Sequence, residues 1–494
     1  MSTLSLSLVS HTNAGKTTLA RTLLVSDVGE VRDAPHVTEL AEAHELIATA
    51  QGDRLVLWDT PGFGDSARLA QRLRQSASPL GWLLSQVWDR WRDRPFWASQ
   101  QAMRHVQAHS DVVLYLVNAA ESPAAAGYVA AEMELLGWMG KPVLVLLNQL
   151  GEPRAAALEA QDLQAWRGHL APWPLVRAVL SMDAFGRCWV HEMTLLRAVQ
   201  SVLQGAQAQA MERLAQAWRT RSLATYEATV VELAHSLARL ALLRQGVTAS
   251  GGVRASLRQL GDALTGRGDE QAPAARAQQA LTADLQQEIA DSTGRLLGLH
   301  GLVGSAQVQA QARILERVAG LFALQARVPE GKAALMGGAL TGALTGLKAD
   351  IASGGLTLGG GMLAGALLGA LGAAGLARGI NVVRGTDQSW VRVSDEAMDP
   401  LVQAALLRYL AVAHFGRGRG EWVQAEAPAH WPAAVAQALL PQQEALNTLW
   451  RARPSRPADA ADEAALALAL QPLLTAALAR VFVALYPDSE NPLT

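Results

Sequence analysis

Ser10-His11-Thr12-Asn13-Ala14-Gly15-Lys16-Thr17-Thr18 lies between an apolar run at residues 4–9 and a helical segment at 19–24. A strand, a glycine-bearing loop and a Lys-Thr pair that opens a helix form the layout of a phosphate-binding loop, or P-loop. In such a loop, backbone N–H groups converge on phosphate oxygens, the lysine reaches the outer phosphates and the following hydroxyl binds magnesium. The pattern departs from the strict motif at Ser10, where the motif has glycine. It predicts that nucleotide is bound by Asn13, Ala14, Gly15, Lys16, Thr17 and Thr18.

Length and composition set the limits for the rest of the chain. A chain of 494 residues, half of them hydrophobic, is long enough for two or three domains with substantial cores. The net charge of −2 gives no strong nucleic-acid signal. A single cysteine, Cys188, excludes an internal disulfide and fits a reducing compartment. Because the first residues run directly into the P-loop strand, we expect a cytoplasmic location and no export.

Short apolar runs alternate with helical segments in residues 1–200, which is typical of an α/β domain with a mostly parallel sheet. The runs expected to form strands are 4–9, 44–48, 54–58, 112–117, 142–147 and 175–180. From about Gln207 onward, long helices rich in Ala, Leu, Gln and Arg are expected, and no strand. The predicted fold is an α/β P-loop nucleotide domain at 1–204 followed by an all-α region. The all-α region divides into helices at 205–330, an apolar Gly/Ala-rich hairpin at 331–380 and helices at 381–494.

A second motif, Asp59-Thr60-Pro61-Gly62, follows the apolar run 54–58. An aspartate at a strand end can hold magnesium through water, and the N–H of Gly62 can contact a γ-phosphate. Thr38 lies between the two motifs in a polar loop. We expect it either to supply a second magnesium hydroxyl or to cap a helix that follows.

Together these motifs resemble the TrmE–Era branch of translation-factor-type GTPases over residues 3–200. The residues 110–119, which begin Ser110-Asp111, resemble the strand that follows in that branch. The resemblance extends to a bacterial group of Era-like GTPases that carry a long C-terminal domain of unknown function. It implies a GTPase that binds GTP and GDP with Mg²⁺, with Lys16, Thr38, Asn13 and Gly62 as catalytic residues. The metal ligands it implies are Thr17, Thr38 and Asp59.

The chain departs from the family pattern where the base is read. The family motif Asn-Lys-x-Asp corresponds to Asn148-Gln149-Leu150-Gly151, which keeps the asparagine and lacks the carboxylate that accepts from guanine. A hydrogen-bonding acceptor of this kind can decide between bases, so guanine selectivity is expected to be relaxed. Ser181 and Met182 occupy the position of the family's base-contacting Ser-Ala pair.

Two further positions concern hydrolysis. Phe63 stands where some GTPases carry the glutamine that orients the attacking water, so slow turnover is expected. In the branch that the chain resembles, an asparagine at the position of Asn13 helps to hold a potassium ion against the phosphates. The alternative for Asn13 is a structural role in the loop backbone.

An insertion after the second motif, at about 66–108, is rich in tryptophan. Trp82, Trp88, Trp91 and Trp97 lie in it, with arginines among them. These side chains either pack the insertion onto the domain or form a surface for a partner or membrane.

The Gly/Ala-rich block has glycine at every fourth position, at 338, 342 and 346 and again at 361, 365 and 369. Such stripes let two helices approach closely. Two arms at 333–348 and 362–378 span about 25 Å each at ~1.5 Å per residue, which is short of a ~30 Å bilayer core. We expect a hairpin that contacts the inner membrane peripherally or inserts partly. A single span at 351–377 and a buried soluble hairpin are the alternatives.

The sequence therefore predicts a GTPase whose nucleotide state controls a helical effector region, with a membrane surface or membrane protein as partner. The alternative is a nucleotide-binding interaction module with little hydrolysis or relaxed base specificity. A tRNA-modifying or ribosome-associated role rests on family analogy alone, and the neutral charge argues against it. Homodimerisation across the nucleotide is left open.

Overall fold

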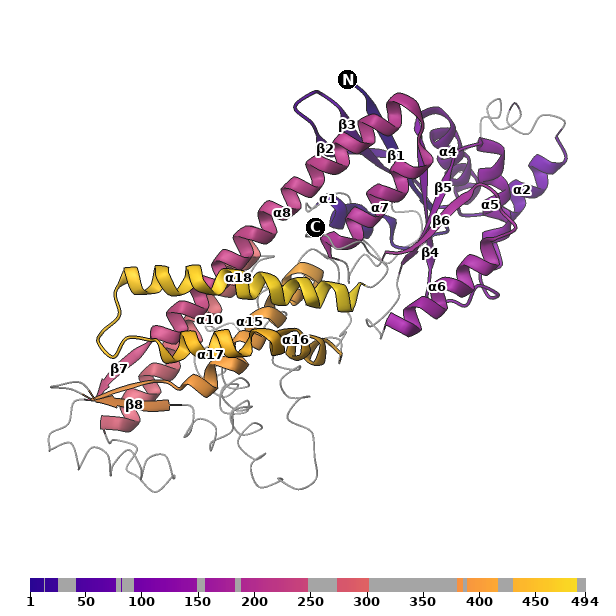
Figure 1. Cartoon of the computed structure of the whole chain (residues 1–494). Helices are drawn as coiled ribbons and strands as arrows, with labels where there is room; N and C mark the ends of the chain where they lie inside the picture. Colours follow the sequence, from indigo (N-terminus) through magenta and orange to yellow (C-terminus); the bar gives the residue numbers. More distant parts are fainter. Residues whose placement is uncertain are drawn as a thin grey trace.

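A single long helix, α8 (Gly205–Leu242), runs from an N-terminal α/β lobe into a C-terminal helical lobe (Figure 1). The computed structural model describes residues 1–12, 14–24, 41–76, 81, 93–148, 156–182, 188–247, 273–301, 380–384, 389–415 and 430–486. Several sequence predictions lie outside these residues. They concern Asn13, Thr38, Gln149 to Gly151, three of the four tryptophans of the insertion (Trp82, Trp88 and Trp91), and the Gly/Ala-rich block.

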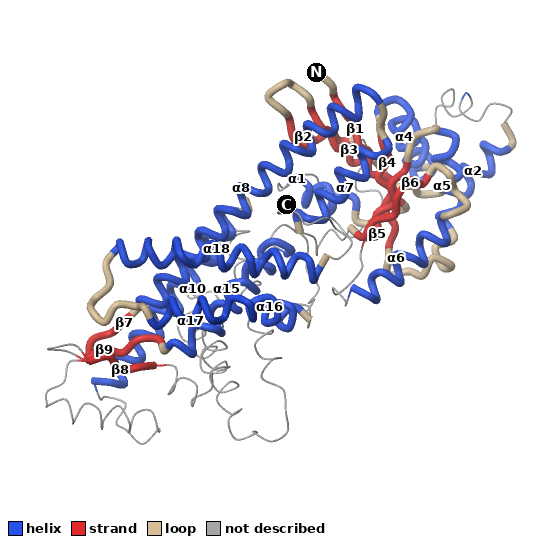
Figure 2. Tube along the Cα trace, in the orientation of Figure 1, coloured by secondary structure: helices blue, strands red, loops and turns tan. Residues whose placement is uncertain are grey.

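The N-terminal lobe is built on a six-stranded sheet of order β2-β3-β1-β4-β5-β6 (Figure 2). All neighbouring strands are parallel except β2, which is antiparallel to β3. The predicted mostly parallel α/β sheet is therefore confirmed. Its strands are β1 (Thr3–Ser10), β2 (Glu42–Ala48), β3 (Arg54–Asp59), β4 (Val112–Asn118), β5 (Val143–Asn148) and β6 (Val176–Ser181).

Helices cover both faces of this sheet because the central strands are apolar on both sides, as buried parallel strands are. On β1, Leu4, Leu6 and Leu8 point into one core and Val9 into the other. The helices of this lobe are α1 (Lys16–Leu24), α2 (Ser66–Arg74), α4 (Arg94–His109), α5 (Tyr128–Met139), α6 (Ala156–Leu170) and α7 (Trp189–Val202).

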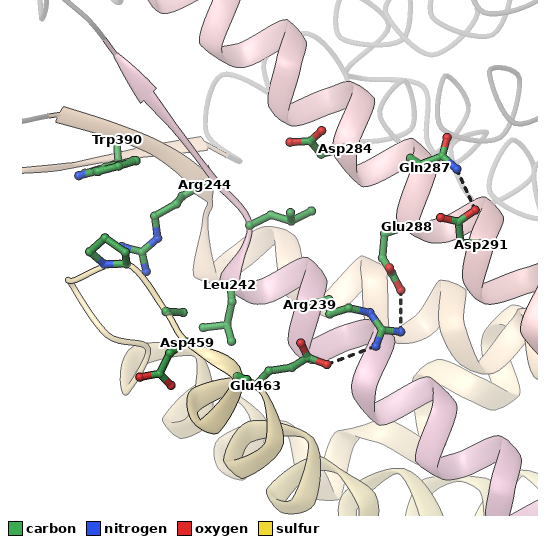
Figure 3. A pocket seen from close by; sticks show the side chains of 14 residues that line it. Arg239, Leu242, Arg244, Asp284, Gln287, Glu288, Asp291, Trp390, Asp459 and Glu463 are labelled. Carbon is green, nitrogen blue, oxygen red and sulfur yellow. Dashed lines mark hydrogen bonds and ion pairs between the residues drawn. The ribbon is translucent and has the colours of Figure 1, made fainter.

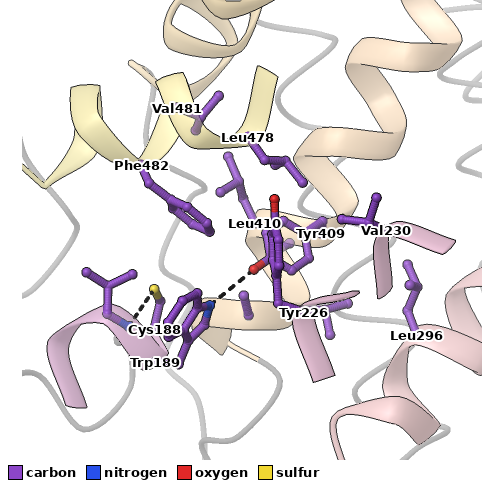
Figure 4. Packing of buried hydrophobic residues seen from close by; sticks show 14 of the residues in the cluster. Cys188, Trp189, Tyr226, Val230, Leu296, Tyr409, Leu410, Leu478, Val481 and Phe482 are labelled. Atoms are coloured by element: carbon purple, nitrogen blue, oxygen red, sulfur yellow. Dashed lines mark hydrogen bonds between the residues drawn. The ribbon is translucent and has the colours of Figure 1, made fainter. Parts of the chain in front are cut away.

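The C-terminal lobe packs its helices along α8 (Figure 1). Its elements are α10 (Pro273–Leu299), α15 (Asp395–Phe415), α16 (Trp431–Leu439), η2 (Leu440–Gln442), α17 (Gln443–Arg451) and α18 (Ala460–Leu485). The core of this lobe is continuous with one sheet face of the N-terminal lobe. Where the lobes join, aromatic side chains from four helices meet, among them Trp189, Tyr226, Tyr409 and Phe482 (Figure 4).

The prediction that no strand follows Gln207 is wrong. A three-stranded antiparallel sheet of order β7-β9-β8 lies at the far end of the helical lobe (Figure 2). The strands are β7 (Arg244–Val247), β8 (Ile380–Arg384) and β9 (Ser389–Val393). They are four or five residues long, and β7 contains a glycine, so their local apolar pattern is weak. Their pairing partners lie far apart in the chain, and tertiary contacts rather than local propensity specify them. The region is mostly helical rather than all-α.

Among the described residues, α18 is the one helix whose length and composition would allow it to cross a membrane. One face of α18 is buried against its neighbours, and side chains such as Leu470, Leu474 and Leu478 are fully buried there. This is the pattern of a core helix in a helical domain as much as that of a span.

Candidate functional site

The P-loop is the turn between β1 and α1, and its shape depends on one glycine. Gly15 has φ of +87°, in the left-handed region that L side chains rarely adopt. The helix begins at the next residue, Lys16, so the N–H groups of its first turn point toward the loop. Ala14, Gly15, Lys16, Thr17 and Thr18 therefore lie together at a helix N-terminus, which favours anions.

Lys16 is buried, and its Nζ atom donates to the Oγ atom of Ser10 over 3.0 Å. The Ser10 hydroxyl in turn donates to the carbonyl of His11. Ser10 thus fills the position of the motif's glycine with an acceptor for the lysine, a role that the sequence did not indicate. Burial lowers the pKa of Lys16, and the nearby Asp59 and Glu132 carboxylates oppose this shift.

Gly62 lies directly against Lys16. A Cβ atom at Gly62 would be 3.0 Å from Nζ of Lys16 and 3.2 Å from Cα of Thr12, so a larger residue here would crowd the lysine and the P-loop backbone. The structure therefore brings the predicted lysine and the predicted γ-phosphate contact together.

Asp59, at the end of β3, faces the first turn of α1. Its Oδ2 atom accepts from Oγ1 of Thr17 over 2.5 Å. Its Oδ1 atom is buried and has no hydrogen-bond partner within the described residues. Burial raises the pKa of Asp59, against the attraction of Lys16 and the Thr17 hydrogen bond.

An orphaned carboxylate oxygen beside a threonine hydroxyl is the donor set that Mg²⁺ prefers. Thr17 and Asp59 therefore fit the predicted magnesium site. The third predicted ligand, Thr38, lies outside the described residues.

The segment 60–63 is tied to the P-loop strand by backbone hydrogen bonds. The N–H of Phe63 donates to the carbonyl of Ser10 over 2.9 Å, and the N–H of Thr12 donates to the carbonyl of Phe63 over 3.3 Å. The Thr60 hydroxyl donates to the carbonyl of Leu8. The ring of Phe63 is fully buried, so this side chain is not available to orient a water molecule.

Asn148, Ser181 and Met182 lie at the ends of the neighbouring strands β5 and β6. The buried Asn148 side chain donates from Nδ2 to the carbonyl of Ala14 over 2.7 Å, which links the base side of the site to the P-loop. Met182 is buried, and its N–H donates to the carbonyl of Leu147. Base contacts by these three residues stay a prediction.

Glu132 is a residue of this site that the sequence reasoning missed. It lies on α5, is fully buried, and its Oε1 atom is 2.8 Å from Nδ1 of the P-loop residue His11. A signal was present in the sequence. Glu132 is spaced three and four residues from Val129 and Leu136, so it falls on the apolar face of its helix.

The groove in Figure 3 lies in the C-terminal lobe, between α8, α10 and α18. Arg239, which lines this groove, forms ion pairs with Glu288 over 3.0 Å and with Glu463 over 3.2 Å. These ion pairs join three helices, and we assign the groove a packing role. Across the described ranges, no group of three or more His, Cys, Asp or Glu side chains could hold a metal ion.

Comparison with family models identifies both parts of the chain. Residues 175–471 match the model described as a domain of unknown function (DUF3482), which is more than half of the chain. The chain belongs to the DUF3482 family. Residues 5–149 match the model described as 50S ribosome-binding GTPase. The DUF3482 protein is thus a P-loop GTPase-type chain with this domain at its C-terminal side, as the resemblance predicted, and its place in the TrmE–Era branch stays a prediction.

The solved structures similar to the DUF3482 protein that we compare share low sequence identity with it. Era of Aquifex aeolicus, bound to GDP·AlF4⁻, is 15% identical with a TM-score of 0.31, and the match covers 42% of this chain and 58% of that one. NFeoB of S. thermophilus, bound to mGMPPNP, is 17% identical with a TM-score of 0.24. The match covers 46% of this chain and 69% of the NFeoB chain. The DUF3482 protein thus spans little more than half of the Era chain. No curated protein matches it.

Proposed function

We propose that the DUF3482 protein binds GTP and hydrolyses it to GDP and phosphate. The observation that carries the proposal is the meeting of Lys16, Gly62 and the Thr17–Asp59 pair at one helix N-terminus. A lysine, a helix N-terminus and an oxygen ligand pair are the parts that phosphoryl transfer from a nucleotide requires. Their placement at the carboxyl ends of parallel strands is the usual ligand position of such sheets.

In the proposed reaction, the loop amides and Lys16 hold the β- and γ-phosphates, and the N–H of Gly62 contacts the γ-phosphate. Thr17 and Asp59 would hold Mg²⁺, joined by Thr38, and the bound ion supplies charge neutralisation at the phosphates. Asn148 orients the base side of the site by fixing Ala14. Because the Phe63 ring is buried, no side chain at that position orients the water, and we expect slow turnover. A potassium ion held by Asn13 is part of the proposal.

We further propose that nucleotide state controls the helical lobe through α7 and α8. Arg213 on α8 donates from Nε to Oδ2 of Asp53, at the β2–β3 turn, over 2.7 Å. The β2–β3 hairpin directly follows the segment of the chain that contains Thr38. A change at that segment would thus reach α8, a continuous helix about 57 Å long at ~1.5 Å per residue.

A buried contact joins α7 to the same helix. The indole N–H of Trp218 on α8 donates to Oε2 of Glu192 on α7 over 2.9 Å. At the start of α7, the indole N–H of Trp189 points to the hydroxyl of Tyr409 in the helical lobe over 3.3 Å (Figure 4). Both lobes therefore share α7 and α8 as one packed unit.

Calorimetric titration with GTP, GDP and ATP, followed by phosphate release in sodium and in potassium, tests the proposal. We expect GTP and GDP to bind, and Lys16→Ala to abolish binding while the helical lobe stays folded. Lys141→Ala is the matched control, since Lys141 precedes β5 away from the P-loop. Unchanged nucleotide affinity in Lys16→Ala would overturn the assignment of this loop as the nucleotide site. Equal rates of phosphate release in sodium and in potassium would mean that Asn13 has a structural role and does not hold a potassium ion.

The second candidate is an interaction module that binds nucleotide and turns it over little, or selects the base weakly. The buried Phe63 ring and the missing carboxylate at Gly151 favour it. Turnover separates the two functions: bound GTP that persists unhydrolysed supports the module, and multiple turnovers support the GTPase. Installing Gly151→Asp with Gln149→Lys should sharpen guanine selectivity in either case.

A further inference from the structure

Glu132 is a fully buried carboxylate that the proposed chemistry does not use. Three side chains from different elements bind it. Nδ1 of His11 lies 2.8 Å from its Oε1 atom, and the hydroxyl of Tyr115 donates to its Oε2 atom over 2.5 Å. Ser66 supplies a further hydrogen bond. Burial raises the pKa of Glu132, and the bonds from His11, Tyr115 and Ser66 act in the opposite direction.

The partners of Glu132 belong to the elements that shape the phosphate end of the site. His11 is the second residue of the P-loop, and its ring stacks on Tyr128, with centroids 4.4 Å apart. Ser66 is the first residue of α2, directly after the segment that contains Gly62 and Phe63. The carboxylate thus connects the P-loop to the start of α2 from the side of α5.

Gly62 lies between two fixed points of the chain, and Glu132 binds the second of them. On its N-terminal side, the segment is tied to β1 through Thr60. On its C-terminal side, Phe63 forms a bridge with His11, and α2 starts at Ser66. A buried carboxylate holds Tyr115 and Ser66 firmly, because these two buried donors would otherwise be left unsatisfied, and it binds the partly exposed His11 from the interior.

We infer that Glu132 is a positioning residue for the γ-phosphate. It fastens His11 and Ser66 to α5 and so sets the distance between Gly62 and Lys16. The inference rests on the proposed function, because a γ-phosphate is the group that would meet both residues. Glu132 itself acts through His11 and Ser66, and it reaches no reacting atom.

Glu132→Gln tests this role, because it keeps the shape of the side chain and removes one acceptor and the charge. Glu134→Gln is the matched control. Glu134 also lies on α5 and links it to α2, through a hydrogen bond of 2.7 Å from Nε of the exposed Arg74 rather than one to the P-loop. His11→Ala is a second test variant, since His11 is partly exposed and its loss leaves room for water.

The first readout needs no nucleotide. Hydrogen exchange at the amides of Thr12 and Phe63 should become faster in Glu132→Gln and His11→Ala, and should stay at the wild-type rate in Glu134→Gln. Unchanged exchange at both amides in the two test variants would overturn the inference, whether or not the wild type binds nucleotide.

The second readout is affinity for GDP and for GTPγS. In Glu132→Gln we expect GTPγS affinity to fall about tenfold and GDP affinity to stay within about twofold, the scale of one lost hydrogen bond to a charged group. A residue with a purely structural role would weaken both ligands equally or neither, and that result would overturn the inference. A wild type that binds neither nucleotide would instead overturn the proposed function, and the exchange data would still decide whether Glu132 fastens the loop.

Discussion

Thr17 donates its hydroxyl to one oxygen of Asp59 over 2.5 Å, while the other oxygen of this carboxylate is buried without a partner in the described part of the chain. The hydrogen bond orients the carboxylate and leaves its second oxygen free to accept a ligand. A preoriented oxygen loses little entropy when it accepts a ligand. We therefore regard this pair as the anchor of magnesium binding.

The first prediction concerns this pair. Asp59→Asn should raise the magnesium concentration needed for half-maximal GTP binding by about tenfold or more, because a carboxylate ligand is replaced by a neutral amide. Thr17→Val should act in the same direction while keeping the side-chain volume. The measurement is a magnesium titration of nucleotide binding, with Thr22→Val as control, since Thr22 lies on α1 and donates to the backbone of Thr18. A magnesium dependence like that of the wild type in both variants would contradict the assignment.

The second prediction concerns the α8 contact. Arg213→Ala should weaken the transmission of nucleotide state to the helical lobe while hydrolysis stays within about twofold, because Arg213 binds Asp53 and is remote from the P-loop. Arg213 is partly exposed, and the buried Asp53 keeps the hydrogen bond from the backbone N–H of Ser2, so the variant should stay folded. The measurement is the difference in hydrogen exchange of α10 between the GDP and GTPγS states. Arg219→Ala, farther along α8, is the control. If the exchange difference of α10 between the two nucleotide states is as large in Arg213→Ala as in the wild type, α8 does not transmit the nucleotide state through Arg213.

The α/β lobe could be predicted from sequence because its strands carry their own signal. Parallel strands buried on both faces are continuous apolar runs, and β4 and β5 have this pattern throughout. The strands β7 and β9 are a contrasting case. β7 (Arg-Gln-Gly-Val) has one apolar side chain, β9 (Ser-Trp-Val-Arg-Val) is only five residues long, and the two pair with each other across a long stretch of chain, so their local sequence contains no comparable signal.

At the site, the motif residues were predictable and their partners were not. Lys16, Asp59 and Gly62 follow from the spacing of two motifs. The acceptor role of Ser10 depends on how the P-loop turns back on itself, and the link from Asn148 to Ala14 depends on how two distant strand ends meet, neither of which a linear pattern specifies. Glu132 lies more than a hundred residues from His11, and its position on an apolar helix face was the available hint.

The third prediction concerns acid sensitivity of the helical lobe. His414 on α15 is buried, its Nδ1 atom lies 2.7 Å from the carbonyl of Leu410, and burial lowers the pKa of His414 to about 3. His191 and His430 lower it further, and Tyr486 contacts its other ring nitrogen. Because the unfolded chain takes up this proton near pH 6.5, stability is fully present above that pH and is lost as pH falls toward 3.

Between pH 7 and pH 5, the free energy of unfolding of the wild type should therefore fall by about 2 kcal/mol more than that of His414→Gln, which has no imidazole to protonate at this position. Urea unfolding at both pH values, followed by tryptophan fluorescence, measures this difference. His169→Gln, on the exposed face of α6, should lose stability in parallel with the wild type. Parallel loss in His414→Gln as well would show that His414 does not carry the effect.

The last prediction concerns membrane contact, which we propose for the Gly/Ala-rich block at 333–377 rather than for α18. Two glycine stripes in isolated, exposed helices would cost roughly 1 kcal/mol per glycine relative to alanine, so they make sense where helices press together. In contrast, α18 already buries one face in the helical lobe, and its exposed Leu468 and Val483 lie on the other. We expect the wild type to pellet with membranes and a 333–377 deletion to stay soluble. Leu468→Ser with Val483→Ser should pellet like the wild type, because α18 is held by its core contacts. If the wild type stays in the soluble fraction with either nucleotide, the block does not contact membrane, and a buried hairpin explains its glycine stripes.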